Sequence, residues 1–336
     1  MKYDIAVIVP VYNCENYIKE CLEAIILNFN AKYKMQVIII DDGSRDNTAN
    51  ICKDYQKRYR NITYKYQENQ GVSVARNTGL YMTDAKFVMF VDADDILCMD
   101  AIDICLDNMK NADFLIGGYT TFKSNFLMEK NENIEFFGNI KDFSKEIEKW
   151  LYPPYVLSPW GKVFKNDIIK DNNIKFLRNI NYGEDAIFVF EYLCNVKNVV
   201  SMAKIIYNHR VDNYNSLGSG YKSNLIDCDI IVNKYLEKFL KENGNDKYEV
   251  ICNDRFVQNF SGNIRKLILS DLKSGEKKKI FFNKALEYKA IGKFEASNKK
   301  NLAEKITYLA LKYKKLYFLL YLHYVKRSIE RIIGGK

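Results

Sequence analysis

The chain has 336 residues, of which 48% are hydrophobic, and carries 51 basic against 42 acidic residues for a formal net charge of +9. Such a composition excludes a disordered protein, and the length allows one large core or two domains. The eight cysteines include no C-x-x-C pair, which excludes common zinc-site patterns and favours free, mostly buried thiols in a reducing compartment. Because no secretory signal pattern precedes the first apolar run, we expect a cytoplasmic protein.

The first 120 residues alternate short apolar runs with amphipathic segments. The runs have strand composition and lie at residues 5–9, 37–40, 62–66 and 87–91. The segments that follow them have helical spacing and lie at residues 15–29, 48–59, 71–82 and 99–110. Near-continuous apolar strands separated by helices predict a mostly parallel sheet covered on both faces. Ligands of such sheets bind beyond the carboxyl ends of the strands.

Polar residues gather at three of these strand ends, at residues 10–13, 41–44 and 92–95. In the last group Asp92 and Asp94 alternate along the chain, so their carboxylates can converge on one hard cation such as Mg²⁺ or Mn²⁺. An isolated D-x-D is more often an acidic turn that caps a following helix. The pair alone therefore does not establish a metal site.

The pattern is less regular from residue 120 to 215, and we interpret this region as further structure packed on the same sheet. After residue 219 the chain is helical almost to its end, with breaks expected at Gly244 and Gly275. The helical segments lie at residues 224–243, 246–270, 277–291 and 301–333.

Four motifs in a fixed order give the acidic turn a context. They are VIVPVYN at residues 7–13, IIIDDGSRDNT at 38–48, NQGVSVARNTG at 69–79 and FVDADD at 90–95. Together they resemble the successive motifs of the family 2 glycosyltransferases with the GT-A fold, over roughly residues 4–215. The resemblance implies an α/β, Rossmann-like fold with a mostly parallel sheet flanked by helices. The implied domain spans residues 1–220, with a nucleotide-sugar half at 1–118 and an acceptor-side half at 119–220, and a helical extension follows at 221–336.

By this resemblance Pro10, Tyr12 and Asp42 line a pocket for the base of the donor. The Tyr12 ring would lie on uracil, and the Asp42 carboxylate would accept its ring N–H. The alternative for Tyr12 is core packing, because a tyrosine at a strand end often buries its ring. Arg76 is expected to meet phosphate or sugar oxygens of the nucleotide, and its alternative is a solvent-exposed helix arginine.

The resemblance also gives the acidic turn its roles. Asp92 is the implied ribose or sugar contact, Asp94 the direct ligand of Mn²⁺ or Mg²⁺, and Asp95 a structural residue. The metal would stabilise the charge that grows on the leaving nucleoside diphosphate. His209, one of two histidines, lies where GT-A enzymes often place a group near the metal, so we assign it as a second ligand. The alternative is an ordinary surface or core histidine.

Glu184 and Asp185 open a helix-like stretch and look like the family's E-D motif, in which Asp185 takes the proton from the acceptor hydroxyl. A helix N-terminus lowers the pKa of a carboxylate and an apolar pocket raises it, so a usable base needs the second effect to offset the first. The alternative is a pair of first-turn acids that complement the helix dipole. Residues 158–164 resemble the segment that shapes the acceptor side, where Trp160 either stacks on a sugar or packs in the core.

The basic excess belongs to the end of the chain, because residues 271–336 contain seventeen Lys or Arg against six Asp or Glu. The apolar run at 316–325 is about half as long as a helix that crosses a bilayer, which needs about twenty residues. With its flanking cations it is typical of a helix lying in the headgroup region of an anionic membrane. The alternative is a core helix or a dimer seam. No nucleic-acid motif accompanies the charge.

The sequence therefore predicts an inverting glycosyltransferase that uses a UDP-sugar and Mn²⁺ or Mg²⁺. Its acceptor would be a glycan or lipid-linked glycan in bacterial surface polysaccharide synthesis, at the inner face of the cell membrane. One alternative is a sugar-phosphate nucleotidyltransferase, which would need a Gly-rich basic loop in place of residues 11–14. Another is a non-catalytic membrane-surface scaffold. The chain has no dinucleotide-binding or P-loop motif, which makes dinucleotide enzymes and P-loop kinases unlikely matches.

Overall fold

The computed structural model describes most of the chain, and its residues divide into two compact units. The described residues are 3–29, 32–123, 126–131, 134–151, 156–178, 180, 182–211, 222–298, 301–314, 317, 320 and 323–324. The first unit comprises Met1–Asn215 with Glu242–Gly244, and the second comprises Ser216–Lys241 with Asn245–Lys336. The domain boundary predicted at residue 220 lies outside the described residues and stays a prediction.

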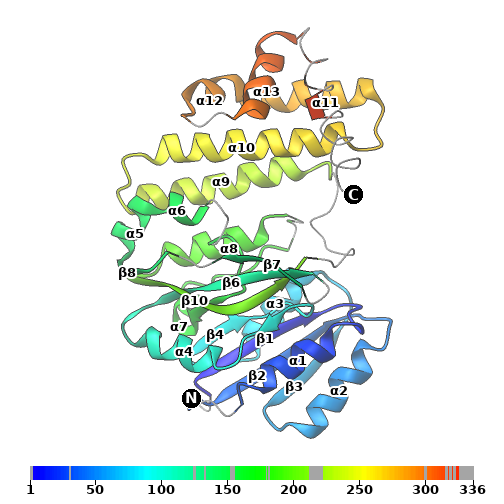
Figure 1. Cartoon of the computed structure of the whole chain (residues 1–336), viewed down its shortest axis with the longest axis vertical. Helices are drawn as coiled ribbons and strands as arrows, with labels where there is room; N and C mark the ends of the chain where they lie inside the picture. The colour runs from blue at the N-terminus through cyan, green and yellow to red at the C-terminus, as the bar shows by residue number, and fades with distance from the viewer. Residues whose placement is uncertain are drawn as a thin grey trace. The chain divides into compact units, whose positions relative to one another are not determined.

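The described part of the first unit contains one ten-stranded sheet (Figure 1). Its strands are β1 Ile5–Val11, β2 Met35–Asp42, β3 Ile62–Gln67, β4 Phe87–Phe90, β5 Ile96–Leu97, β6 Phe114–Lys123, β7 Phe126–Asn131, β8 Phe136–Asn139, β9 Lys162–Lys165 and β10 Asn198–Arg210. The helices of this unit are α1 Ile18–Ile26, α2 Thr48–Arg58, α3 Val72–Tyr81, α4 Ala101–Asn108, the 3₁₀ turn Met109–Asn111, α5 Ile140–Glu146, α6 Glu148–Leu151, α7 Asn166–Asp171 and α8 Glu184–Leu193.

The parallel arrangement predicted for the first 120 residues is confirmed. The order is β3-β2-β1-β4-β9-β6-β10-β5, with β7 beside β6 and β8 beside β10. The β3-β2-β1-β4 part is parallel, as is the pair β6 and β10, whereas β5, β7, β8 and β9 run antiparallel to their neighbours. Because β2 and β4 flank β1 on opposite sides, the chain reverses direction across the sheet at β1, where α/β folds bind ligands.

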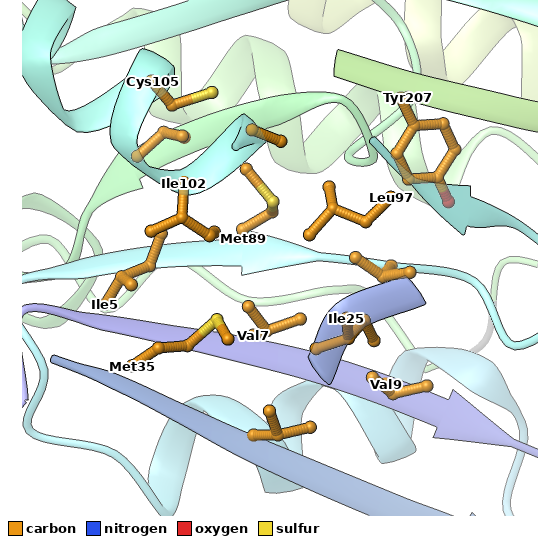
Figure 2. Close-up of a cluster of buried hydrophobic side chains, with 14 of the residues drawn as sticks. Ile5, Val7, Val9, Ile25, Met35, Met89, Leu97, Ile102, Cys105 and Tyr207 are labelled. Carbon is orange, nitrogen blue, oxygen red and sulfur yellow. The ribbon is translucent and has the colours of Figure 1, made fainter. Parts of the chain in front are cut away.

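Both faces of β1 are buried, which explains its continuous apolar sequence. Val7 and Val9 face a core that includes Ile25 of α1 and Met89 of β4 (Figure 2). On the other face of the strand, Ala6 belongs to a second cluster with Ala75 of α3. There α3 packs so closely that a Cβ on Gly79 would lie 2.4 Å from the Ile8 side chain. This close approach fixes α3, and with it the residues one turn earlier, against the strand.

The second unit is helical in its described residues. Its helices are α9 Leu225–Glu242, α10 Tyr248–Ile268, α11 Ser274–Glu287, α12 Ala290–Ala296 and α13 Leu302–Lys312. The single helix predicted at 277–291 is wrong, because Lys289 adopts a left-handed conformation with a φ of 50° and separates α11 from α12. The break predicted at Gly275 is also wrong, since this residue lies within the first turn of α11.

The aromatic run at 316–325 is described only at four residues. Tyr317, Leu320 and Tyr324 are buried in the core of the second unit together with residues of α10 and α11. His323 is the fourth described residue, and the remaining members of the run and all residues after 324 lie outside the described residues. These three side chains fit the core-helix alternative. None of the helices in the described ranges combines the length and the apolar character needed to span a membrane.

Candidate active site

The loops after β1 and β2 are tied together at the carboxyl end of the sheet. The Asn13 N–H donates to the Ser44 hydroxyl over 3.0 Å, and the Arg45 N–H donates to the Asn13 side-chain oxygen over 2.8 Å. Pro10 is buried within β1, whereas Tyr12 directly after the strand leaves 49% of its surface exposed. Core packing of Tyr12 is therefore wrong, and its ring is accessible to a ligand.

Asp42 ends β2 and is held by three hydrogen bonds. Its Oδ1 accepts from the Gln67 side chain over 2.8 Å and from the Gln70 N–H over 2.9 Å. Its Oδ2 accepts from the Gly71 N–H over 2.8 Å. A carboxylate offers about four acceptor positions. The Asp42 side chain is thus fixed in orientation and can accept one more hydrogen bond.

The acidic turn after β4 is anchored through its last residue. Asp95 is buried and accepts from the Tyr207 hydroxyl over 2.7 Å and from the Arg210 N–H over 2.8 Å. Arg210 also donates from Nε to the Asp94 carbonyl oxygen over 2.8 Å. Desolvation raises the pKa of Asp95 to about 6, against the opposing contact with His209. These contacts agree with the structural role expected for Asp95.

His209 lies on β10 beside this turn. Its Nδ1 is 3.2 Å from both carboxylate oxygens of Asp95, and its ring stacks on the Trp160 indole with 4.9 Å between centroids. Burial lowers the pKa of His209, but the neighbouring carboxylates outweigh this effect and raise the pKa overall. Tyr207 stacks on the same indole at 5.0 Å. These ring contacts favour the packing alternative for Trp160.

Arg76 joins two carboxylates from distant parts of the chain. From α3 its Nη2 donates to Asp92 over 2.9 Å, and its Nη1 donates to Asp185 over 2.5 Å. The arginine is 3% exposed, whereas the side chains of Asp92 and Asp185 keep 27% and 30% of their surface exposed. Burial favours the neutral guanidine, but Asp185 and Asp92 raise the pKa of Arg76 above its ordinary value. The alternative of a solvent-exposed arginine is wrong.

Asp185 is the second residue of α8, which begins directly after Gly183. This glycine has a φ of 85°, a conformation that glycine adopts without strain. Desolvation raises the pKa of Asp185 to about 7, against the lowering effect of Arg76 and together with the raising effect of Glu184. A partly exposed carboxylate that releases its proton near neutrality can act as a general base toward a hydroxyl.

Two buried basic residues near these groups did not follow from the sequence. Lys162 begins β9 and donates from Nζ to the Ser158 hydroxyl over 3.3 Å. Burial lowers the pKa of Lys162 to about 7, although the charge of Asp185 opposes this shift. Arg210 donates from Nη2 to Glu20 over 2.6 Å. Lys162 lies within the predicted acceptor-side segment 158–164, and Arg210 directly follows the predicted ligand His209. A basic residue next to predicted site residues is the signal that could have identified each of them.

The residues predicted to bind a metal fit a site with few protein ligands. Within the described ranges, no group of three or more His, Cys, Asp or Glu side chains could hold a metal ion. A cation bound together with a diphosphate needs only one or two carboxylates, and Asp94 is the one that the sequence predicts for this role. His209 presents Nδ1 to Asp95, an arrangement typical of a histidine whose other nitrogen binds a metal.

Comparisons with known proteins bear on the N-terminal part of the chain. Residues 6–172 match the family model described as "Glycosyl transferase family 2". Glycosyltransferase GlyA of Streptococcus pneumoniae is 29% identical over 222 residues, which cover 62% of this chain and 30% of GlyA. The minor teichoic acid biosynthesis protein GgaB of Bacillus subtilis is 33% identical over 215 residues, which cover 62% of this chain and 23% of GgaB. The match thus spans less than a third of each relative's length.

Solved structures with the same fold include the 1–349 fragment of S. aureus TarS. Its complex with UDP aligns with a TM-score of 0.66 at 18% identity, covering 99% of this chain and 92% of that fragment. Its complex with UDP-GlcNAc aligns with a TM-score of 0.56 at 20% identity, covering 92% and 79%. At this identity the likeness concerns the fold, and it confirms the predicted α/β class with its C-terminal helices.

Proposed function

We propose that this chain, which belongs to glycosyl transferase family 2 through residues 6–172, moves a sugar from a UDP-sugar to a hydroxyl of a glycan or lipid-linked glycan. The observation that carries the proposal is Asp185. Its carboxylate is partly exposed, its pKa is raised to about 7 by burial, and Arg76 holds it beside Asp92. A base of this kind, next to a predicted sugar contact, is what hydroxyl activation requires.

The donor pocket of the proposal is built from the ends of β1 and β2. The exposed Tyr12 ring offers a face for a base, and Asp42 has one acceptor position left for a ring N–H. Uracil supplies such an N–H, whereas the same ring position in cytosine has none. The UDP and UDP-GlcNAc complexes of TarS support a uridine donor.

The proposed reaction is a single displacement with inversion. The acceptor oxygen forms a bond to the anomeric carbon as the bond from that carbon to the diphosphate breaks. The acceptor proton passes to Asp185, which must therefore enter the reaction as a carboxylate. Asp92 contacts the ribose or the sugar and keeps the anomeric carbon in line with the acceptor.

Asp94 and His209 are the residues that would hold Mn²⁺ or Mg²⁺ in this proposal. A bound cation supplies Lewis-acid stabilisation of the charge on the leaving nucleoside diphosphate. The residues of the chain itself hold the acidic turn in a fixed orientation. Arg210 fixes the Asp94 carbonyl oxygen, and Tyr207 fixes Asp95, so the turn cannot move away from the diphosphate.

The proposal extends to surface glycan synthesis and to the membrane. GgaB is named for teichoic acid biosynthesis, which supports a bacterial surface acceptor. Membrane association at the inner face of the cell membrane rests on the basic excess of residues 271–336. Because Tyr317, Leu320 and Tyr324 are buried in the second unit, the basic residues rather than these side chains would make the contact.

A donor panel tests the proposal. The protein is incubated with UDP-, GDP- and CMP-linked sugars in the presence of Mn²⁺, and the free nucleotide is measured. We expect release of UDP from one UDP-sugar and a much weaker affinity for UDP in Asp42→Ala. Release of pyrophosphate from UTP and a sugar phosphate would instead identify a nucleotidyltransferase, and inactivity with every donor would favour a scaffold.

A further inference from the structure

Both terminal nitrogens of Arg76 donate to carboxylates of the chain itself. Nη1 and Nη2 already donate to Asp185 and Asp92, and the residue is 3% exposed. Its Nε is buried and has no hydrogen-bond partner in the described structure. Each terminal nitrogen keeps a second N–H, but burial leaves little of the guanidinium open to a phosphate. The geometry therefore points first to the two carboxylates as partners of Arg76, whereas the sequence resemblance implied contact with the donor.

Packing beneath the guanidinium fixes it in place. Arg76 lies over the Phe176 ring, 5.2 Å from its centroid, and the neighbouring Asn77 exchanges two hydrogen bonds with the Phe176 backbone, over 2.8 and 2.9 Å. Phe176 stacks on Phe188 at 4.0 Å and meets Phe90 edge-on at 5.3 Å. These rings tie α3 to the two segments that carry the partners of Arg76.

The same rings hold the backbone segments that carry both carboxylates. Phe90 lies two residues before Asp92, and Phe188 lies one helical turn after Asp185. Their own ring centroids are 5.7 Å apart. The backbone on each side of the bridge is thus set by aromatic packing, and the bridge sets the side chains. A fork with two nitrogens suits this task, whereas a lysine ammonium could not span both partners with the same geometry.

We propose that Arg76 positions the base and not the donor, because its guanidinium locks the carboxylates of Asp92 and Asp185 into one rigid unit. This role deepens the proposed function and rests on it for the identity of Asp185 as the base. Donor contact at Asp92 is then linked to the base through a single side chain. The arginine acts through Asp185 and is a positioning residue.

The charges around Asp185 predict how the bridge can be detected. Glu184 on the same helix and Asp92 after β4 disfavour its ionised form, whereas Arg76 on α3 and Lys162 on β9 favour it. A cation in contact with a carboxylate lowers its pKa by about 1–3 units. Loss of Arg76 should therefore move the acidic limb of the rate against pH profile upward by about 1–3 pH units.

The test uses Arg76→Gln and Arg76→Lys in the full chain, with Arg210→Gln as a matched loss of a buried arginine that does not contact Asp185. We expect Arg76→Gln to bind UDP within about threefold of wild type, because no donor contact is lost. Its turnover at neutral pH should fall and should recover at alkaline pH. Arg76→Lys keeps a positive charge and should shift the acidic limb of the pH profile less than Arg76→Gln does. Arg210→Gln should leave the acidic limb unchanged.

A second measurement does not depend on activity. Carbon-13 NMR of labelled aspartate carboxyls, with the Asp185 signal assigned from Asp185→Asn, follows the proton on Asp185 directly. We expect its titration in Arg76→Lys to lie above that of wild type. An unmoved titration, or a large loss of UDP affinity with an unmoved pH limb, would overturn the role and return Arg76 to the donor site. Absence of UDP binding by the wild type would instead contradict the proposed function, while the titration still decides the role of Arg76.

Discussion

Each of the two compact units contains a buried arginine paired with aspartate, and the two pairings differ in exposure. In the first unit Arg76 bridges Asp92 and Asp185, whose side chains are 27% and 30% exposed. In the second unit Arg255 lies 3.7 Å from Asp229, whose side chain is 10% exposed. The first arrangement leaves carboxylates open to a ligand, whereas the second encloses them. A buried arginine is therefore a sign of a functional site when the carboxylates that it binds remain partly exposed to solvent.

Neighbouring amides complete the enclosed pair. Asn259 donates to Asp229 over 3.2 Å, and Asn263 donates to the other carboxylate oxygen. Arg255 also donates to the Asp229 carbonyl oxygen over 3.5 Å. Asp229 lies on α9 and its partners lie on α10. A satisfied network between two helices specifies how they pack, and its loss costs stability and not catalysis.

Removal of the predicted metal ligand should have the largest effect at the open site. Asp94→Ala is expected to lower donor turnover about 10²–10³-fold, the usual cost of losing one charge-stabilising group. The melting temperature should change little because Asp94 is partly exposed. Turnover is measured with and without added Mn²⁺. The control is Asp84→Ala, an exposed surface carboxylate paired with Lys170. Near-normal Mn²⁺-dependent turnover of Asp94→Ala would refute the metal assignment.

Loss of the enclosed pair of Arg255 and Asp229 should lower the stability of the protein. Arg255→Met leaves Asp229 buried without its cation and is expected to cost about 3–5 kcal/mol in the free energy of unfolding. Chemical denaturation measures this change. Lys241→Met, which breaks the exposed pair with Glu237, should leave the free energy of unfolding close to that of wild type. Similar costs for the two variants would show that the enclosed network is not structural.

The pH dependence of turnover distinguishes the open site further. Burial raises the pKa of Asp185 from 3.8 to about 7, so the proton must leave before this residue can act as a base. Below that pKa the rate should fall about tenfold per pH unit, and it should reach a plateau above it. UDP affinity measured over the same range should not follow this limb. A rate that stays constant down to pH 5 would exclude Asp185 as the base.

The smallest expected effect concerns membrane association. One Lys or Arg near an anionic surface contributes about 1 kcal/mol, which is roughly fivefold in affinity. Lys279→Gln removes an exposed cation from α11 and should weaken binding to phosphatidylserine vesicles at low salt by about that factor. Lys57→Gln, an exposed lysine of the first unit, should stay within about twofold of wild type. Equal losses of vesicle affinity in the two variants would mean that the basic C-terminal region does not direct membrane binding.

Much of the first unit could be predicted from the sequence because its signals are local. The four apolar runs are strands β1 to β4, and the ordered motifs resemble the family whose model matches residues 6–172. The Arg76 bridge could not be predicted, since Asp185 lies 109 residues away and no local pattern links the two. The 316–325 run was ambiguous for a different reason. A basic amphipathic sequence is equally suited to a membrane surface and to the helical core in which Tyr317 is buried.

The central claim is that Asp185 is the base of a glycosyl transfer, and Asp185→Asn tests it most directly. Asparagine keeps the shape of the side chain but cannot take the acceptor proton. UDP affinity, measured by calorimetry, should stay within a few fold of wild type, while sugar transfer should fall about 10²–10⁴-fold at pH values above the Asp185 pKa of about 7. Unchanged transfer would contradict the claim and leave Asp185 as a first-turn acid of α8.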